Sequence, residues 1–363
     1  MSRPLVPTYI RDLSPYKPGK PIREVQEELG LQHVVKLASN ENPRGGSPRA
    51  LEAIRACLGE LARYPDVGAL DLRDAIAAHF KVRRENVVCG SGSESILANI
   101  LRTFLEHDDE LLTSEGTFVG FYVLAQSRGV ALRTVPLRAD YHFDLDAMAA
   151  AIGPKTRLVY LANPNNPTGT IFSKAEFSHF MEQVPSHTLV VMDEAYIEYV
   201  DPSADNPDSL LYRFDNVLTL RTFSKSHGLA GLRVGYGFAH GDLITNLMKV
   251  KLPFEPSIPG QAAGVAALQD TDFLAHTLAL SAEGRQRLTE ALEAKGFAPV
   301  PSQANFVMFP LASAEEADAF ARHCLLSGVI VRPLGAFRLP HCIRVSTGLR
   351  EEIDRFIEVL QAW

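Results

Sequence analysis

The hydrophobic positions along the chain follow two alternating spacings from about residue 47 onward. Residues 47–62 (SPRALEAIRACLGELA) carry apolar side chains at helical spacing, with Ser47 as the N-cap and Pro48 in the first helical position. Residues 157–164 (RLVYLANP) and 188–196 (TLVVMDEAY) are instead short apolar runs that end in polar residues. Such runs are typical of strands buried on both faces of a parallel sheet.

The same alternation continues through the middle of the chain. Helical spacing recurs in residues 93–105 (SESILANILRTFL) and 121–129 (FYVLAQSRG). Further strands are expected in NVVCG (86–90), ELLTSE (110–115), VALRTVPL (130–137), NVLTLRTFS (216–224) and RVGYGFA (233–239). We therefore predict an α/β fold with a mostly parallel sheet of about seven strands, covered by helices on both faces.

Three prolines and a glycine in residues 253–260 (PFEPSIPG) interrupt this pattern. Beyond them we expect long helices at about 260–295 and then a smaller α+β unit. That unit has strands in ANFVMFP (304–310), VIVRP (329–333) and HCIRVSTG (341–348), and helices in EEADAFARHCLLSG (315–328) and EEIDRFIEVLQAW (351–363). We divide the chain into an N-terminal arm with part of the small domain (1–45), a large domain (46–255) and a small C-terminal domain (256–363).

Charge and composition narrow the possible partners. A net charge of -7, from 36 basic and 43 acidic residues, offers no basic field for nucleic acid. The four cysteines show neither C-x-x-C spacing nor neighbouring histidines, so we expect reduced thiols and no metal site. The N-terminal residues lack the apolar run of a signal peptide, and no apolar stretch approaches the roughly 20 residues that cross a bilayer. We expect a cytoplasmic protein without a membrane partner.

Chemically useful residues follow the predicted strands, where ligands bind in open α/β sheets. In CGSGSES (89–95) a turn directs the N–H groups of Gly92, Ser93 and Glu94 at an anion, although such turns also hold glycine for steric reasons. In NPNNPTG (163–169) two prolines and a glycine fix the amide of Asn166, unless the segment is only an asparagine-rich turn.

Two more segments complete this set. Asp193 in MDEAY (192–196) is either a buried carboxylate that needs a cation or a helix cap. TFSKSHGLAGLR (222–233) gathers two hydroxyls and two cations, although a lone lysine usually lies in a surface loop. Together the segments supply an anion cradle, a carboxylate, an amide, a tyrosine and an amine, which is the set that pyridoxal phosphate uses.

The ordered motifs resemble those of a known family over nearly the whole chain. They are LSPYKPGKP (13–21), LASNENPRG (37–45), YPDVGALDLR (64–73), NPNNPTG, DEAYIEY (193–199), TFSKSHGLAGLRVGYG (222–237) and RVSTGLREE (344–352). The chain resembles the fold-type I pyridoxal-phosphate enzymes of the aspartate aminotransferase family, and within them it is most similar to the histidinol-phosphate aminotransferases. The resemblance implies pyridoxal 5'-phosphate as cofactor, in a large domain with a seven-stranded sheet joined to a small α+β domain.

The resemblance also implies roles for single residues. Lys225 would form the Schiff base and later move the proton at Cα, and Asp193 would pair with the pyridinium nitrogen. Asn166 and Tyr196 would hold the phenolic oxygen, with Asn166 also facing the substrate. The catalytic set is thus Lys225, Asp193 and Tyr196. The phosphate would be bound by Thr222, Ser224 and Arg233 together with the turn of Gly92, Ser93 and Glu94, and Phe118 in EGTFVGFY (115–122) would stack on the ring.

The remaining implied roles concern the second subunit and the substrate. Tyr64 would reach the cofactor phosphate of the other subunit, which implies a homodimer. Arg344 would grip the substrate's carboxylate or the group that replaces it, and Arg332 and Tyr16 would contact its distal end. In one departure from the family, Ser95 stands where relatives carry a second acid after the turn.

The resemblance implies that histidinol phosphate and 2-oxoglutarate are converted to imidazole-acetol phosphate and glutamate, a step of histidine biosynthesis. An aromatic amino-acid aminotransferase and a threonine-phosphate decarboxylase remain alternatives, because they share the cofactor site. A regulator with an aminotransferase-like domain is disfavoured, since the chain has neither a helix-turn-helix motif nor a basic segment.

Overall fold

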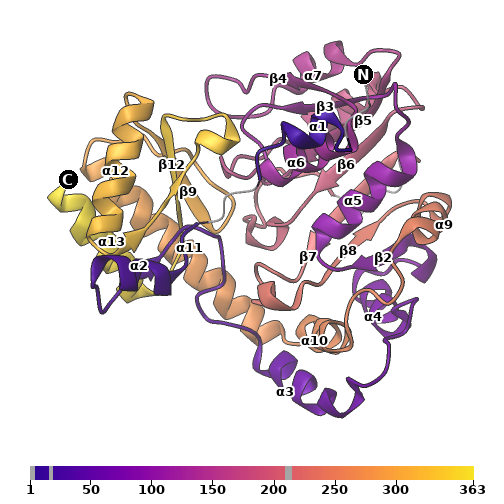
Figure 1. The fold of residues 1–363 in the computed structure, drawn as a ribbon, viewed down its shortest axis with the longest axis horizontal. Coiled ribbons are helices and arrows are strands. Elements are labelled where there is room, and N and C mark those ends of the chain that lie inside the picture. The colour runs from indigo at the N-terminus through magenta and orange to yellow at the C-terminus, as the bar shows by residue number, and fades with distance from the viewer. Residues whose placement is uncertain (1–4, 16–18, 209–214) are drawn as a thin grey trace.

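The computed structural model describes residues 5–15, 19–208 and 215–363, and its largest feature is a seven-stranded sheet with helices on both faces (Figure 1). The strand order is β2-β8-β7-β6-β5-β3-β4. Strands β4, β3, β5, β6 and β7 run parallel, which confirms the predicted α/β fold. The strands are β2 (Val87–Gly90), β3 (Glu110–Ser114), β4 (Ala131–Val135), β5 (Thr156–Ala162), β6 (Leu189–Asp193), β7 (Val217–Thr222) and β8 (Gly235–Phe238).

Strand β8 is the exception to the parallel arrangement, since it pairs antiparallel with both β7 and β2. A short connection, residues 223–234, joins β7 to β8, and short connections join antiparallel strands. The parallel strands β5, β6 and β7 end at one edge of the sheet, where Ala162 pairs with Asp193 and Asp193 with Leu220. The segments that follow these strands are therefore neighbours in space.

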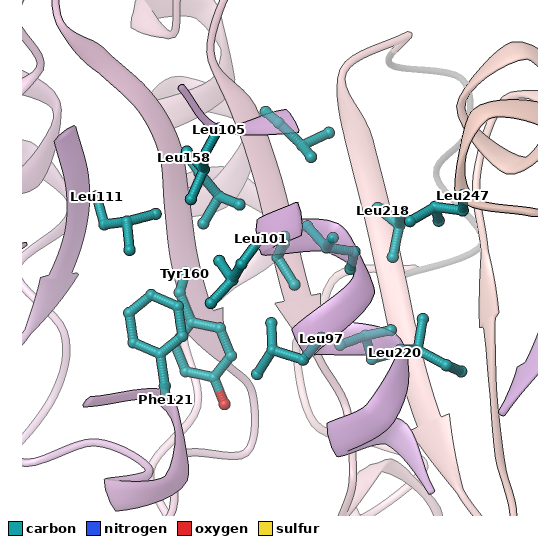
Figure 2. Close-up of a cluster of buried hydrophobic side chains, with 14 of the residues drawn as sticks. Leu97, Leu101, Leu105, Leu111, Phe121, Leu158, Tyr160, Leu218, Leu220 and Leu247 are labelled. Carbon is teal, nitrogen blue, oxygen red and sulfur yellow. The ribbon is translucent and has the colours of Figure 1, made fainter. Parts of the chain in front are cut away.

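Alternate residues of the central strands pack against helices on opposite faces. On β5, Leu158 and Tyr160 lie in a core with α5, α6 and α9, whereas Val159 and Leu161 lie in a core with α7 and α8. The Tyr160 ring stacks on Phe121 with centroids 4.2 Å apart (Figure 2). A third core joins β2 and β8 to α3, α4 and α10. These helices are α3 (Pro48–Ala56), α4 (Leu70–Phe80), α5 (Ser93–Phe104), α6 (Val119–Arg128), α7 (Leu145–Ala151), α8 (Lys174–Gln183), α9 (Gly241–Val250) and α10 (Ile258–Leu268).

Turn chemistry places several of these helices as the sequence predicts. The hydroxyl of Ser47 accepts from the N–H of Ala50, and Pro48 opens α3. The N-cap of α5 is Gly92, so this helix begins directly after the glycine-serine turn that follows β2. Three of the cysteines are buried free thiols, and Cys57 is half-buried. Within the described ranges no helix is long and apolar enough to span a membrane.

A smaller unit lies beside the sheet and carries the C-terminus (Figure 1). Its antiparallel sheet has the order β11-β12-β9 and shares a core with α11, α12 and α13. Its elements are β9 (Phe306–Pro310), β11 (Arg332–Pro333), β12 (Cys342–Ser346), α11 (Thr271–Ala294), α12 (Ala314–Leu326) and α13 (Arg350–Ala362).

The prediction of a single strand over VIVRP is wrong. Its first two residues form β10 (Val329–Ile330), which pairs in parallel with β1 (Val35–Lys36), whereas Arg332 and Pro333 form β11 on the other sheet. The reason is that the strand partner of β10 comes from the N-terminal segment, which the local pattern of 329–333 does not reveal.

Parts of the N-terminal segment contact each of the two units. Helix α1 (Thr8–Arg11) lies beside α6, and α2 (Ile22–Leu29) lies with the smaller unit (Figure 1). After β1, the N–H of Leu37 donates to the Ile330 carbonyl at 2.8 Å. Further on, the segment packs on the turn after Lys225: Gly228 has a φ of 70°, and a Cβ there would stand 1.9 Å from the Gly45 carbonyl oxygen. Only glycine fits this crossing.

Candidate active site

A cavity of about 360 Å³ lies at the carboxyl ends of β5, β6 and β7, where these ends face the smaller unit. Residues from the sheet, the N-terminal segment and the smaller unit line it together. Twelve of the predicted site residues are among them: Ser93, Glu94, Phe118, Asn166, Asp193, Tyr196, Thr222, Ser224, Lys225, Arg233, Arg332 and Arg344. The structure thus brings together positions that are far apart along the chain.

Asp193 ends β6 with its carboxylate removed from water. The Tyr160 hydroxyl donates to Oδ2 at 2.7 Å, and the N–H of Ala195 donates to Oδ1 at 3.2 Å. Burial raises the pKa of Asp193 above its usual value, and the nearby charge of Glu94 adds to the rise. A carboxylate in this state gains from a cationic group in the cavity, which favours a ligand site over the alternative of a helix cap.

Lys225 lines the same cavity. Its side chain is half-buried, its Nζ donates to the Ser39 carbonyl at 3.3 Å, and it stands 5.6 Å from the Tyr196 ring centroid. The amine therefore faces the cavity with one carbonyl and one aromatic ring beside it, so the surface-loop alternative is wrong for this lysine.

An anion cradle forms where the β7–β8 connection meets the amino end of α5. The Thr222 hydroxyl donates to Ser224 Oγ at 2.9 Å, and Arg233 Nη1 donates to the same oxygen at 3.4 Å. Gly92 has a φ of 83°, and a Cβ there would lie 2.7 Å from the Arg233 guanidinium. Gly92 does not line the cavity, but its missing side chain lets the guanidinium approach α5. Among the described residues no side chain caps α5, so two hydroxyls, a guanidinium and a helix end suit a phosphate.

The cradle, Asp193, Phe118 and Lys225 all line one cavity. This donor set fits pyridoxal phosphate: the cradle would hold its phosphate, Asp193 would pair with a protonated ring nitrogen, and the Lys225 amine could react with its aldehyde. The fit rests on the chemistry and burial of the groups.

The smaller unit contributes two arginines to the cavity. Arg332 on β11 and Arg344 on β12 are directly opposite each other in the antiparallel pair, and both are buried. Both guanidiniums lie over the Phe337 ring, at 5.8 Å and 5.7 Å from its centroid. Arg344 also donates through Nη1 to Asn166 Oδ1, which leaves the Asn166 Nδ2 to donate elsewhere.

Tyr64 does not line the cavity; its side chain is 78% exposed, and its ring stacks on Phe254 with centroids 4.2 Å apart. Tyr16 lies outside the described residues.

Three residues that the structure places at or beside the site were given no role from the sequence. Tyr160 holds Asp193, and its signal was a hydroxyl-bearing aromatic inside a buried strand just before NPNNPTG. Asn40 lines the cavity and belongs to the quoted LASNENPRG motif, but it received no role. Glu255 Oε2 accepts hydrogen bonds from the Ser95 hydroxyl at 3.2 Å and from the Ser91 N–H at 3.3 Å. A distant loop therefore brings a carboxylate to the turn where Ser95 departs from the family.

Comparisons with known proteins agree along the whole chain. Residues 32–360 match the family described as aminotransferase class I and II. The chain is 44% identical over 358 residues to the histidinol-phosphate aminotransferase of Anaeromyxobacter sp. (strain Fw109-5), covering 98% of both. It is also 44% identical over 358 residues to that of Methylobacillus flagellatus, covering 98% of this chain and 96% of the relative. The crystal structure of histidinol-phosphate aminotransferase from Sinorhizobium meliloti in complex with pyridoxal-5'-phosphate is similar, with a TM-score of 0.91, 32% identity and 99% coverage of both chains.

The raised pKa of Asp193 gives a stability prediction for the ligand-free protein. A raised pKa means that the folded state binds the Asp193 proton more tightly than the unfolded chain does. The folded protein therefore loses stability as the pH rises through the folded-state pKa and Asp193 becomes ionised. Asp193→Asn should therefore stabilise the ligand-free protein at about pH 8, by on the order of 1 kcal/mol, and the gain should shrink towards about pH 4.5. Urea unfolding of both proteins at the two pH values measures it.

Asp201→Asn serves as the control, because Ser203 lowers the pKa of this exposed carboxylate. It should give no gain at either pH. A loss of stability in Asp193→Asn that is equal at both pH values would contradict the role of the buried charge.

Proposed function

Since the chain belongs to the class I and II aminotransferases, we propose that it transfers the amino group of histidinol phosphate to 2-oxoglutarate, as a step of histidine biosynthesis. The products are imidazole-acetol phosphate and glutamate. The enzyme depends on pyridoxal phosphate. The observation that most supports this substrate is the pair formed by Arg332 and Arg344 on neighbouring strands.

These two arginines favour a doubly charged anion. Like charges directly opposite each other on paired strands destabilise a sheet, and burial strengthens their repulsion. A phosphate ester, with up to two charges and three free oxygens, can engage both guanidiniums, whereas a carboxylate has one charge and two oxygens. The amino acids phenylalanine and tyrosine offer only the carboxylate. The relatives named above support the same choice, because their names state this activity.

The cofactor residues act by holding and orienting. When bound, pyridoxal phosphate supplies a ring that accepts electrons from the carbon that carries the transferred amino group. The cradle of Thr222, Ser224 and Arg233 would hold its phosphate, and Asp193 would share a proton with its ring nitrogen. Asn166 and Tyr196 both line the cavity and would donate to its phenolic oxygen.

Lys225 would perform the proton transfer. Its side chain is half-buried and lines the cavity. A general base must lie within hydrogen-bond distance of the proton that it moves, and a substrate bound in this cavity would meet that requirement. The amine would first be bonded to the cofactor and would be released when substrate takes its place. It would then carry the proton from the substrate Cα to the cofactor carbon.

We also propose that the enzyme is a homodimer in which Tyr64 completes the site of the partner. Tyr64 is exposed on a surface where Lys251 Nζ donates to the Val67 carbonyl, joining two loops. Large apolar side chains are exposed along both loops: Leu58, Leu61, Val67, Leu70, Leu252 and Phe254. Exposed apolar side chains of this kind favour burial against another protein surface.

The role of Lys225 predicts where the cofactor is attached. Purified protein should be yellow, and borohydride should fix the cofactor covalently to Lys225, as peptide mapping would show. Lys225→Ala should still bind the cofactor but lose about 10³-fold or more in kcat, because the same amine transfers the proton. A label on Lys251, a buried lysine whose Nζ donates to backbone carbonyls, would overturn the assignment.

The arginine pair predicts a difference between substrates. Arg332→Ala should lower kcat/KM for histidinol phosphate by about 2 to 4 kcal/mol in transition-state stabilisation, the cost of removing one partner of a buried charged contact. It should change kcat/KM for phenylalanine far less. Arg350→Ala, an exposed arginine paired with Glu283, is the matched control and should change neither. Equal losses for both substrates would favour the aromatic aminotransferase, and carbon dioxide released from threonine phosphate would favour the decarboxylase.

The shared site predicts complementation between inactive subunits. Tyr64→Ala and Lys225→Ala homodimers should both have low activity. Mixed dimers should regain activity in one of their two sites, which combines an intact Lys225 with an intact Tyr64 from the partner. The protein should sediment as a dimer. Sedimentation as a monomer, or no recovery after subunit exchange is demonstrated, would contradict the proposal.

A further inference from the structure

Three consecutive residues of the N-terminal segment each contact one functional group of the cavity. The strap formed by residues 38–40 ends at Asn40, the first residue of the sequence NENP (40–43), and lies against β12. Two of these contacts use backbone carbonyls, and the third uses the amide of Asn40. They are Arg344 Nη2 to the Ala38 carbonyl at 2.8 Å, Lys225 Nζ to the Ser39 carbonyl at 3.3 Å, and Asn40 Nδ2 to the Tyr196 hydroxyl at 2.9 Å.

A second contact fixes which way the Asn40 amide faces. The Asn40 backbone N–H donates to Ser346 Oγ at 2.9 Å, and the Ser346 hydroxyl donates its own proton to Asn40 Oδ1 at 2.8 Å. Because Oδ1 is held in this way, Nδ2 must face Tyr196. The Asn40 carbonyl in turn accepts from Asn305 Nδ2 at 3.1 Å. Asn40 is 1% exposed, and its amide has one defined orientation.

This orientation determines the direction of the Tyr196 hydrogen bond. An amide nitrogen only donates, so the Tyr196 oxygen accepts from Asn40 and the phenolic proton remains for another acceptor. We infer that Asn40 is a positioning residue of the transamination site, which fixes the Tyr196 hydroxyl as a donor toward the phenolic oxygen of the cofactor. The inference rests on the proposed function, in which Tyr196 holds that oxygen.

The backbone of Asn40 explains why asparagine suits this position. Its φ is 54°, in the left-handed region that asparagine and glycine adopt more readily than most residues. Glycine would keep the backbone and lose the amide, whereas alanine would add strain. Asn40→Gly therefore removes the contact to Tyr196 with the least disturbance, and it leaves the charged groups of the cavity unchanged: Glu94, Asp193, Lys225, Arg233, Arg332 and Arg344.

The test is a pH titration of the visible absorption band of the enzyme loaded with pyridoxal phosphate. The band changes when the nitrogen shared by Lys225 and the cofactor loses its proton, and an anionic phenolic oxygen nearby favours that proton. Donation from Tyr196 weakens this effect, so losing the donor shifts the midpoint to higher pH. Asn40→Gly should raise the midpoint by about half to one pH unit, the scale of one neutral hydrogen bond.

A double-mutant cycle with Tyr196→Phe tests whether Asn40 acts through this phenol. Tyr196→Phe should also raise the midpoint, and adding Asn40→Gly to it should cause no further change. Ser346→Ala, outside the cavity, should shift the midpoint in the same direction by freeing the Asn40 amide. Asn42→Ala removes another buried amide of the same segment, which bonds the Ser226 carbonyl, and should leave the midpoint unchanged.

An unchanged midpoint in both Asn40→Gly and Ser346→Ala overturns the inference. So do additive shifts in the double variant, or an equal shift in Asn42→Ala, which would indicate a general loss of structure. If Asn40→Gly does not fold, Ser346→Ala decides alone. Failure of the proposed function looks different, because the wild type would then show no visible band that depends on Lys225.

Discussion

Asp193 ends a buried strand with its carboxylate removed from water, and the other groups of the site determine whether this buried charge is compensated. Tyr160 and the backbone of Ala195 supply hydrogen bonds, but neither supplies positive charge. A buried carboxylate that stays ionised needs a cation, and the protonated ring nitrogen of the cofactor would provide one. Lys225 and the anion cradle line the same cavity, so under the proposed function a ligand held at Asp193 would also be held at its phosphate and reached by the amine. Binding would then offset the free-energy cost of the buried charge.

The substrate side of the cavity depends on the smaller unit and on the N-terminal segment. Strand β12 presents Arg344 to the cavity, opposite Arg332 on β11, and its last residue, Ser346, bonds Asn40. The same strand thus holds Arg344, which we propose binds the substrate, and contacts the strap of residues 38–40, in which Asn40 bonds Tyr196. Since these hydrogen bonds are buried, a displacement of β12 would disturb both Arg344 and the Asn40 contact to Tyr196.

Much of this arrangement could be predicted from the sequence, because it depends on local patterns. Apolar runs ending in polar residues located β5, β6 and β7, and the turn residues after them located Asn166, Asp193 and Lys225. Family motifs added Phe118 and the two arginines, which line the same cavity. Local pattern failed at residues 329–333, where two short strands join different sheets, and at Glu255, whose partners lie at the turn before α5.

The sequence by itself determined the class of fold and the chemical groups of the site, because hydrophobic period and turn chemistry act between residues close along the chain. Only the tertiary structure decided how those groups are paired. The bond from Asn40 to Tyr196, the opposition of Arg332 and Arg344, and the carboxylate of Glu255 beside Ser95 depend on strand register and loop packing. Register is fixed by the packing of whole elements, since a slip of one residue turns every side chain to the other face of its sheet. No short stretch of sequence contains that information.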